Sequence, residues 1–266
     1  MTSDPAAANE PLLLRQDREG IATLTLNRPQ ARNALSMALM GELLAAFGEL
    51  GRDPAVKVVI LAAAGPAFCA GHDLKELRSL PQREAYESVF RHCSELMLAI
   101  LKLPKPVIAR VHGIATAAGC QLVASCDLAV AAEGVRFATP GVNIGLFCST
   151  PMVALSRAVP RKQAMEMLLT GEPITAERAR EIGLVNQVAP AHELEGATWA
   201  LAKKIAGKSA LVVKIGKEAF YRQAEMDVAA AYAYASQVMT ENMLARDAAE
   251  GIDAFIEKRE PHWQGR

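Results

Sequence analysis

The sequence predicts an α/β fold, with a core of stacked strand–helix units followed by a helical C-terminal region. Half of the 266 residues (51%) are hydrophobic, which is enough for a sizeable buried core. Up to about residue 140, short apolar runs alternate with longer segments whose apolar residues recur at helical spacing. From residue 149 onward nearly every segment has helical spacing. We therefore place the core at residues 11–198 and the helical region at residues 199–266.

The chain is expected to begin with a frayed tail, residues 1–10, and a β-hairpin. The apolar runs 12–15 and 21–26 flank a polar turn that contains Gly20, and the second run alternates large and small side chains as a strand does. Ser36 can cap a helix that runs to about residue 50. A run at 56–63 that is apolar except for Lys57 then predicts a buried strand.

The alternation continues through the rest of the core. Pro81 precedes a helix expected at 82–102, and the apolar run 107–111 predicts another buried strand. The remaining predicted elements are a helix of small residues at 115–125, strands at 127–132, 135–138 and 184–188, and helices at 149–159, 161–170, 176–182, 192–206, 209–225, 228–247 and 249–259.

Charge and cysteine content argue against several classes of protein. Lys+Arg and Asp+Glu number 29 each, so a neutral chain offers no electrostatic case for nucleic acid or an acidic membrane surface. The five cysteines contain no CxxC pair, which favours buried thiols over disulfides or metal ligands. No apolar run approaches the ~20 residues that span a bilayer, and no secretory signal is visible. We expect no nucleic-acid partner, no membrane insertion, no bound metal and a cytoplasmic location.

One loop has the features of a site for an anion or a polarised carbonyl group. Gly65-Pro66 ends the apolar strand, Gly71 permits a tight turn, and Asp73 can cap the helix that follows. Such a turn directs peptide N–H groups outward beside the positive end of a helix. That arrangement can hold an anion or a carbonyl oxygen. We expect residues 113–121 to be the partner of this loop.

Five motifs in order resemble those of the enoyl-CoA hydratase/isomerase (crotonase) family over about residues 11–260. They are Asn27-Arg28-Pro29 with Arg32–Leu35, Phe68–Leu74, Lys105–Ala109 with Gly113, Gly119 and Cys126–Leu128, Phe137 with Pro140 and Gly145, and Gly251–Arg259. Any one motif is weak, but five with the family's spacing are specific. The resemblance implies a spiral core of stacked ββα units, a helical region that forms trimers or dimers of trimers, and acyl-CoA or enoyl-CoA as ligand in fatty-acid metabolism. It implies no cofactor beyond this coenzyme A thioester.

The resemblance also implies an oxyanion hole. The backbone N–H groups of His72 and Ala118 would bind the thioester oxygen and stabilise an enolate as charge develops there. Arg32 and Lys75 would meet phosphates of coenzyme A, although both also fit solvated surface charges. The full set of positions that the resemblance places along coenzyme A is Arg32, Ala34, Ala70, His72, Asp73, Leu74, Lys75 and Ala118, together with Phe255 and Lys258, which often come from a neighbouring subunit.

Both positions at which hydratases of this family carry catalytic glutamates differ in this chain. They hold Gln121 and Gly141, and neither residue can transfer a proton near neutral pH. Losing one general acid–base group typically costs ~10²–10⁴ in rate. We expect weak or no hydratase activity and an acyl pocket widened at Gly141. Two interpretations stay open, an enzyme with an unknown reaction on acyl-CoA and a non-catalytic acyl-CoA-binding or regulatory protein.

No other side chain is an evident replacement for the two acids. His72 can titrate near neutral pH, but its role in the motif is through its backbone. Cys148 would need a base or a lowered pKa to act as a nucleophile, and Ser149 is not an acid. We interpret His112 as a core residue and Asp127 as a structural hydrogen-bond partner.

Overall fold

The computed structural model describes residues 10–266, and two β-sheets form its core. The predicted tail falls almost entirely outside the described residues. The first sheet has the order β1-β2-β3-β5-β7-β10, and the second has the order β4-β6-β8-β9. The strands of the first sheet are β1 (Leu13–Arg18), β2 (Ile21–Leu26), β3 (Val58–Ala63), β5 (Val107–Val111), β7 (Leu128–Ala132) and β10 (Gln187–Ala189); those of the second are β4 (Ala67–Cys69), β6 (Ile114–Thr116), β8 (Arg136–Ala138) and β9 (Ile174–Thr175).

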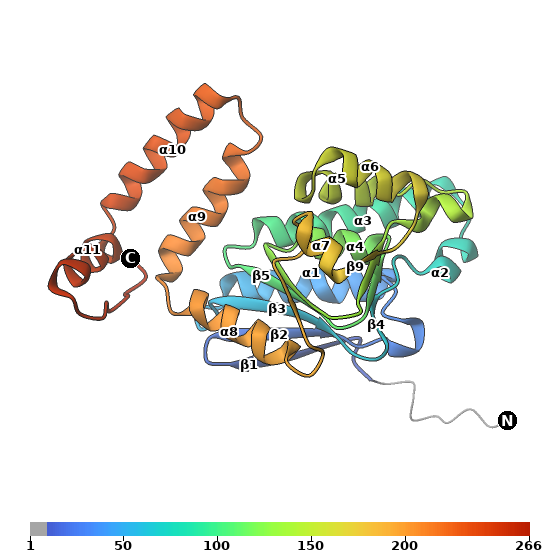
Figure 1. Cartoon of the computed structure of the whole chain (residues 1–266), viewed down its shortest axis with the longest axis horizontal. Coiled ribbons are helices and arrows are strands. Elements are labelled where there is room, and N and C mark those ends of the chain that lie inside the picture. The colour runs from blue at the N-terminus through green and yellow to red at the C-terminus, as the bar shows by residue number, and fades with distance from the viewer. Residues whose placement is uncertain (1–9) are drawn as a thin grey trace.

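Three strand pairs build the core as a spiral of ββα units (Figure 1). β3, β5 and β7 lie side by side in the first sheet, and each continues through a short loop into β4, β6 or β8 of the second sheet. Pairing among β3, β5 and β7, and among β4, β6 and β8, is parallel. A helix follows each pair and returns the chain to the next unit. The predicted α/β fold with a spiral core is confirmed.

Eleven α-helices and two short 3-10 helices complete the described chain. α1, α3 and α4 pack in succession, α5 lies on α4, and α8 packs across β3, β5 and β7. The helices are α1 (Met37–Arg52), α2 (Leu74–Ser79), α3 (Arg83–Lys102), α4 (Ala118–Ser125), α5 (Ser149–Ala158), α6 (Arg161–Thr170), α7 (Ala176–Glu181), α8 (Leu194–Ala206), α9 (Ala210–Gln223), α10 (Val228–Met243) and α11 (Arg246–Glu257), with the 3-10 helices η2 (Pro29–Ala31) and η3 (Pro140–Ile144).

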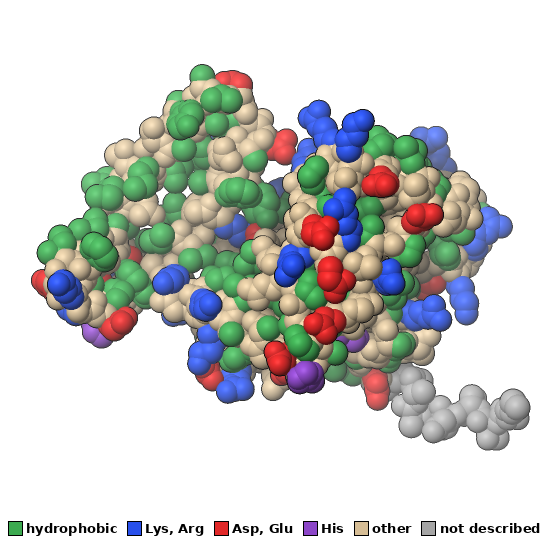
Figure 2. Space-filling model, in the orientation of Figure 1, with side chains coloured by type: hydrophobic (Ala, Val, Ile, Leu, Met, Phe, Trp, Pro, Cys, Tyr) green, Lys and Arg blue, Asp and Glu red, His purple; other side chains and the backbone are tan. Residues whose placement is uncertain are grey.

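Helices α9, α10 and α11 leave the core and extend to one side of it (Figure 1). Hydrophobic side chains cover much of their visible surface (Figure 2). The boundary expected between residues 198 and 199 falls inside α8, which packs against the first sheet. The part of the chain that stands away from the core therefore begins with α9. Within residues 10–266, no helix has the length and apolar composition needed to cross a bilayer.

The predictions failed at the shortest elements. The helix expected at 115–125 is a three-residue strand, β6, followed by a turn at Ala117 and the helix α4. The strand β4 was not predicted, and β10 begins three residues later than the strand expected at 184–188. Strands of two or three residues are too short to show alternation in the sequence, because the signal needs four residues or more.

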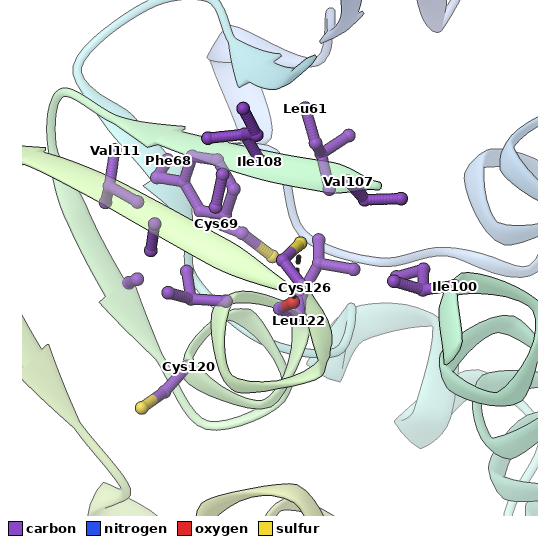
Figure 3. Close-up of a cluster of buried hydrophobic side chains, with 14 of the residues drawn as sticks. Leu61, Phe68, Cys69, Ile100, Val107, Ile108, Val111, Cys120, Leu122 and Cys126 are labelled. Atoms are coloured by element: carbon purple, nitrogen blue, oxygen red, sulfur yellow. Dashed lines mark hydrogen bonds between the residues drawn. The ribbon is translucent and has the colours of Figure 1, made fainter. Parts of the chain in front are cut away.

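Apolar packing between β3, β5 and α4 fixes the position of the loops described below (Figure 3). Phe68 of β4 and Leu122 of α4 are fully buried in this cluster. Cys69 and Cys126 also lie in it, and the Cys126 thiol donates to the Leu122 carbonyl oxygen at 3.3 Å. Burial raises the pKa of Cys69 to about 12, so this thiol is neutral and packs as an apolar group. All five cysteines are free and buried, as the sequence predicted.

Candidate functional site

The candidate site lies where three parallel strands end. The carboxyl ends of β4, β6 and β8 meet at one edge of the second sheet because the three strands are parallel neighbours. His72 follows β4, Ala118 follows β6, and Thr139 follows β8. The Ala117 N–H donates to the Ala138 carbonyl oxygen at 2.9 Å, which ties the second and third of these ends together. The two loops that the sequence singled out therefore come together at this edge.

Two glycines allow these loops to touch. A Cβ atom on Gly119 would lie 2.1 Å from the Cys69 carbonyl oxygen, a separation that no real side chain adopts. A Cβ atom on Gly71 would lie 3.0 Å from the Ala117 Cβ, and the Gly71 φ of +99° also favours glycine. Both glycines are needed for this close approach, whatever else the site does.

Within residues 10–266, the close approach leaves two peptide N–H groups, those of His72 and Ala118, without a backbone partner at the junction. The Leu35 N–H donates to the Gly71 carbonyl oxygen at 2.8 Å, and the Asp73 N–H donates to the Leu35 carbonyl oxygen at 3.1 Å. Since this parallel bridge engages the peptide groups on both sides of His72, the His72 N–H itself points away from Leu35. Ala118 is the first residue of α4, so its N–H has no partner within the helix. The positive end of α4 favours negative charge at the same place.

Backbone strain is concentrated at the turn before Ala118. Ala117 has φ +50° and ψ −117°, a conformation that side chains other than glycine rarely adopt. Such strain costs about 1–3 kcal/mol and persists only where the surroundings enforce it. Here Ala117 is held by its N–H bond to Ala138 and by the Gln121 N–H, which donates to the Ala117 carbonyl oxygen at 3.0 Å. The strained turn sets the direction of the Ala118 N–H.

Two residues whose roles the sequence did not reveal hold the first loop in place. The Arg28 guanidinium contacts Asp73 Oδ2 at 2.8 Å and donates to the Ala34 carbonyl oxygen at 2.7 Å. Asp73 also caps α2, as predicted, by accepting from the Lys75 N–H at 3.0 Å. The hydrogen bond from Arg28 is the main reason that the pKa of Asp73 lies below its usual range. Asn33 is fully buried, and its amide donates to the carbonyl oxygens of Ala64, just after β3, and Ala67, the first residue of β4.

The residues predicted to lie along coenzyme A surround this loop. Arg32 and Lys75 are exposed, and within residues 10–266 neither forms an ion pair. Ala34 is buried, and Ala70 is partly buried with its N–H bonded to the Arg32 carbonyl oxygen at 3.0 Å. Leu74 is half exposed at the start of α2. Two unpaired cations thus stand beside the loop that carries the His72 N–H.

Phe255 and Lys258 do not join this site within one chain. Both lie at the end of α11, on the far side of the molecule from α2 (Figure 1). Phe255 is 85% exposed and Lys258 is also exposed. Their predicted place along coenzyme A can therefore be reached only in a second copy of the chain.

Gln121 is buried beside the helix α3. Its side chain is 4% exposed as part of α4, and its Oε1 accepts a weak hydrogen bond from the Cys93 thiol, with the sulfur at 3.9 Å. Burial raises the pKa of Cys93 to about 12, so Cys93 supplies no thiolate. The position that the resemblance gives to a catalytic glutamate is thus occupied by an amide with a neutral neighbour.

The expectation that Gly141 widens the acyl pocket is wrong. A Cβ atom on Gly141 would lie 2.6 Å from the Leu146 carbonyl oxygen and 2.9 Å from Cys148 Sγ. The Gly141 N–H donates to that sulfur at 3.3 Å. Because the chain after η3 folds back onto Gly141, backbone and thiol fill the space that a side chain would take. A glutamate placed at residue 141 therefore needs this segment to move.

The other candidates have structural surroundings. His112 is partly buried, and its Nε2 lies 2.7 Å from the Gly65 carbonyl oxygen. Asp127 accepts from the Val107 N–H at 2.7 Å and contacts Lys217 on α9. Burial raises the pKa of Cys148 and keeps its thiol neutral, and Ser149 is exposed at the start of α5. Among the residues that the structure describes, no cluster of three or more His, Cys, Asp or Glu side chains is placed to hold a metal ion.

The ββα spiral places the chain in the class of enoyl-CoA hydratases and isomerases. The model of that family matches residues 16–266, so the chain belongs to the enoyl-CoA hydratase/isomerase family. It is 50% identical over 264 residues to the mitochondrial enoyl-CoA hydratase domain-containing protein 3 of Mus musculus, covering 98% of this chain and 88% of the relative. Residues 115–127 and 137–151 are the stretches on which the sequence itself resembles that subgroup.

Solved structures of other proteins also support membership of this family. The crystal structure of an enoyl-CoA hydratase from Mycobacterium smegmatis superposes with a TM-score of 0.94 at 58% identity and covers 96% of this chain and 99% of that one. The crystal structure of human enoyl coenzyme A hydratase domain-containing protein 3 superposes with a TM-score of 0.93 at 49% identity, covering 95% and 100%.

The expected cytoplasmic location is contradicted by these relatives. The proteins of mouse, rat and human that match at 50–51% identity are all named as mitochondrial. The equal numbers of acidic and basic residues do not distinguish the two compartments.

Proposed function

We propose that this protein binds coenzyme A thioesters and stabilises a negatively charged thioester oxygen between the His72 and Ala118 N–H groups. The observation that carries the proposal is the contact of two loops through Gly71 and Gly119, which brings two free N–H donors together at a helix N-terminus. Donors aimed at developing charge in a site that excludes water are worth about 3 kcal/mol each in the transition state. Arg32 and Lys75, unpaired beside this loop, bind phosphates of the coenzyme.

The same site lacks the groups that add water to a double bond. Gln121 and Gly141 stand at the positions of the two glutamates, and Cys148 next to Gly141 is a neutral thiol. Thioester binding with weak or no hydratase activity is the function that fits best. The absence of the two glutamates favours one further candidate, a non-catalytic acyl-CoA-binding or regulatory protein of fatty-acid metabolism.

Ligand-induced stabilisation tests the binding proposal. Butyryl-CoA at 100 times its Kd is expected to stabilise the protein by about 2.7 kcal/mol, visible as a rise in Tm. Free coenzyme A is the matched control, and we expect a smaller rise because it lacks the thioester oxygen. Crotonyl-CoA should be hydrated at least ~10²-fold more slowly than by a hydratase that has both acids. Equal shifts with the two ligands would contradict the oxyanion site, and ordinary hydratase turnover would contradict the role given to Gln121 and Gly141.

We further propose that α9, α10 and α11 assemble the chain into a homotrimer or a dimer of trimers. α10 has no buried residue within one chain, and Val228, Tyr232 and Met239 are 74%, 74% and 62% exposed. A cavity of about 1230 Å³ also separates α9 from α3, α4 and α5. Exposed apolar faces of this kind mark association surfaces. A neighbouring copy would bring Phe255 and Lys258 to the coenzyme.

Light scattering on purified protein tests this assembly. The mass is expected at three or six times that of one chain. Replacing both Tyr232 and Met239 with glutamate should yield smaller species, because charges do not pack in an apolar interface. Met165→Glu is the matched control and should leave the mass unchanged. Met165 is 51% exposed and lies on α6, outside the three helices that leave the core. A wild-type monomer would refute the proposal.

A further inference from the structure

The His72 side chain and the side chain at the position of the missing first acid both contact helix α3. Its ring packs against Phe90 of α3, with the ring centroids 5.5 Å apart. Cys93, three residues further along the same helix, contacts the Gln121 amide. Residues three apart share one face of a helix and lie ~4.5 Å apart along its axis. The His72 imidazole and the Gln121 amide therefore contact α3 at two residues that lie less than one helical turn apart.

One nitrogen of the His72 imidazole has no hydrogen-bond partner in the described part of the chain. Within residues 10–266, two buried side-chain nitrogen or oxygen atoms lack a hydrogen-bond partner, His72 Nε2 and Thr139 Oγ1. Buried polar groups are almost always paired, so each orphan calls for an explanation. Both belong to the sheet edge where β4, β6 and β8 end, on either side of the Ala118 N–H. Both atoms can take a partner that a bound ligand or an ordered water supplies.

The protonation state of His72 suits an acceptor. Burial lowers the pKa of its imidazole, which is therefore neutral at neutral pH and offers a lone pair. Its backbone N–H is one of the two donors for the thioester oxygen, and the α carbon of a thioester is two bonds from that oxygen. One residue thus brings an oxyanion donor and a basic nitrogen to the same end of the ligand.

We propose that the His72 imidazole is the proton acceptor of this site and takes a proton from the α carbon of a bound acyl-CoA. The α C–H bond breaks, its electron pair forms the enolate double bond, and the charge moves to the thioester oxygen between the two N–H groups. The proton goes to Nε2 and returns to the α carbon when the enolate collapses. The proposal rests on thioester binding at this site, and it assigns an enolisation of saturated acyl-CoA that needs neither Gln121 nor Gly141.

Exchange of the α protons of butyryl-CoA in D₂O measures this step directly by proton NMR. The wild-type protein is expected to deuterate the α position, and His72→Gln is expected to lower the exchange rate by ~10²–10⁴. The variant keeps the backbone donor and a side-chain amide, so butyryl-CoA should still raise its Tm. His92→Gln is the matched control, since His92 is a residue of α3 whose Nε2 faces Gly41 of α1 and not the loop of His72. We expect it to exchange at the wild-type rate.

The outcomes separate this inference from the binding proposal. Wild-type protein that binds butyryl-CoA without exchanging its α protons, or undiminished exchange in His72→Gln, would overturn the role of His72 and leave binding intact. A wild-type protein that does not bind butyryl-CoA would overturn both. If His72→Gln does not fold, ¹⁵N-histidine NMR of the wild-type protein tests whether His72 Nε2 meets the bound ligand. The His72 Nε2 resonance, assigned by replacing the other four histidines, must shift when butyryl-CoA binds.

Discussion

Replacing Asp127 with alanine is expected to lower the free energy of unfolding by about 3–5 kcal/mol, because it leaves a buried cation without its partner. Lys217 of α9 contacts Asp127 Oδ2 at 2.7 Å, and the lysine side chain is only 6% exposed. Tyr221, one turn further along α9, donates to Asp127 Oδ1 at 2.9 Å. The same carboxylate accepts from the Val107 N–H in the core. One side chain thus joins β5 to the first of the helices that leave the core.

Calorimetry and hydrogen exchange test this role. Asp127→Ala should lower the Tm and expose the amides of α9 to exchange before those of the core sheet. Lys217→Met added to Asp127→Ala should recover part of the loss, because the unpaired buried charge is then gone. Asp17→Ala is the matched control, since Asp17 is a 42% exposed partner of Arg15, and the change should stay within about 0.5 kcal/mol. An Asp127→Ala protein as stable as the control would show that the Asp127 carboxylate does not hold α9, which would then depend on apolar contacts and on the hydrogen bonds from Lys217 to the Ile100 and Lys105 carbonyl oxygens.

The longer elements could be predicted because their periodicity and their capping residues depend on residues that are close together in the sequence. Ser36 caps α1 by accepting from the Leu39 N–H, as expected, and α3 begins within one residue of its predicted start. β4 and β6 could not be predicted, because they depend on pairing with each other across residues 67–116. Tertiary pairing, rather than local propensity, makes strands of three residues.

In the candidate site, too, some features could be predicted from the sequence and others depend on tertiary contacts. The pairing of the two glycine loops could be expected from the order of the motifs, and the structure brings them together. The contact of His72 with Phe90 and the filling of the space at Gly141 by Cys148 could not be expected. Both depend on where the backbone places residues from separate elements, and neither contact has a fixed spacing in the sequence.

Gly119→Ala is expected to be the most damaging small change in the site. The new methyl group would lie 2.1 Å from the Cys69 carbonyl oxygen and 2.8 Å from its carbon, so β4 and α4 have to separate. Overpacking of this kind typically costs 1–3 kcal/mol, and here the obstacle is backbone that cannot turn aside. Separation would also move the Ala118 N–H away from the His72 N–H. We therefore expect a lower Tm and loss of the extra stabilisation that butyryl-CoA gives over free coenzyme A.

Gly48→Ala separates a local steric effect from the general effect of a glycine replacement. Gly48 lies inside α1, and a Cβ atom there would meet no atom within 4 Å. Alanine at an open helical position typically stabilises by about 0.5–1 kcal/mol, so this variant should melt higher and bind butyryl-CoA as the wild type does. A Tm that falls in Gly119→Ala and rises in Gly48→Ala would show that the contact with Cys69 requires glycine at residue 119. If Gly119→Ala melted and bound like Gly48→Ala, the two loops would not be in contact, and the paired N–H donors would lose their structural basis.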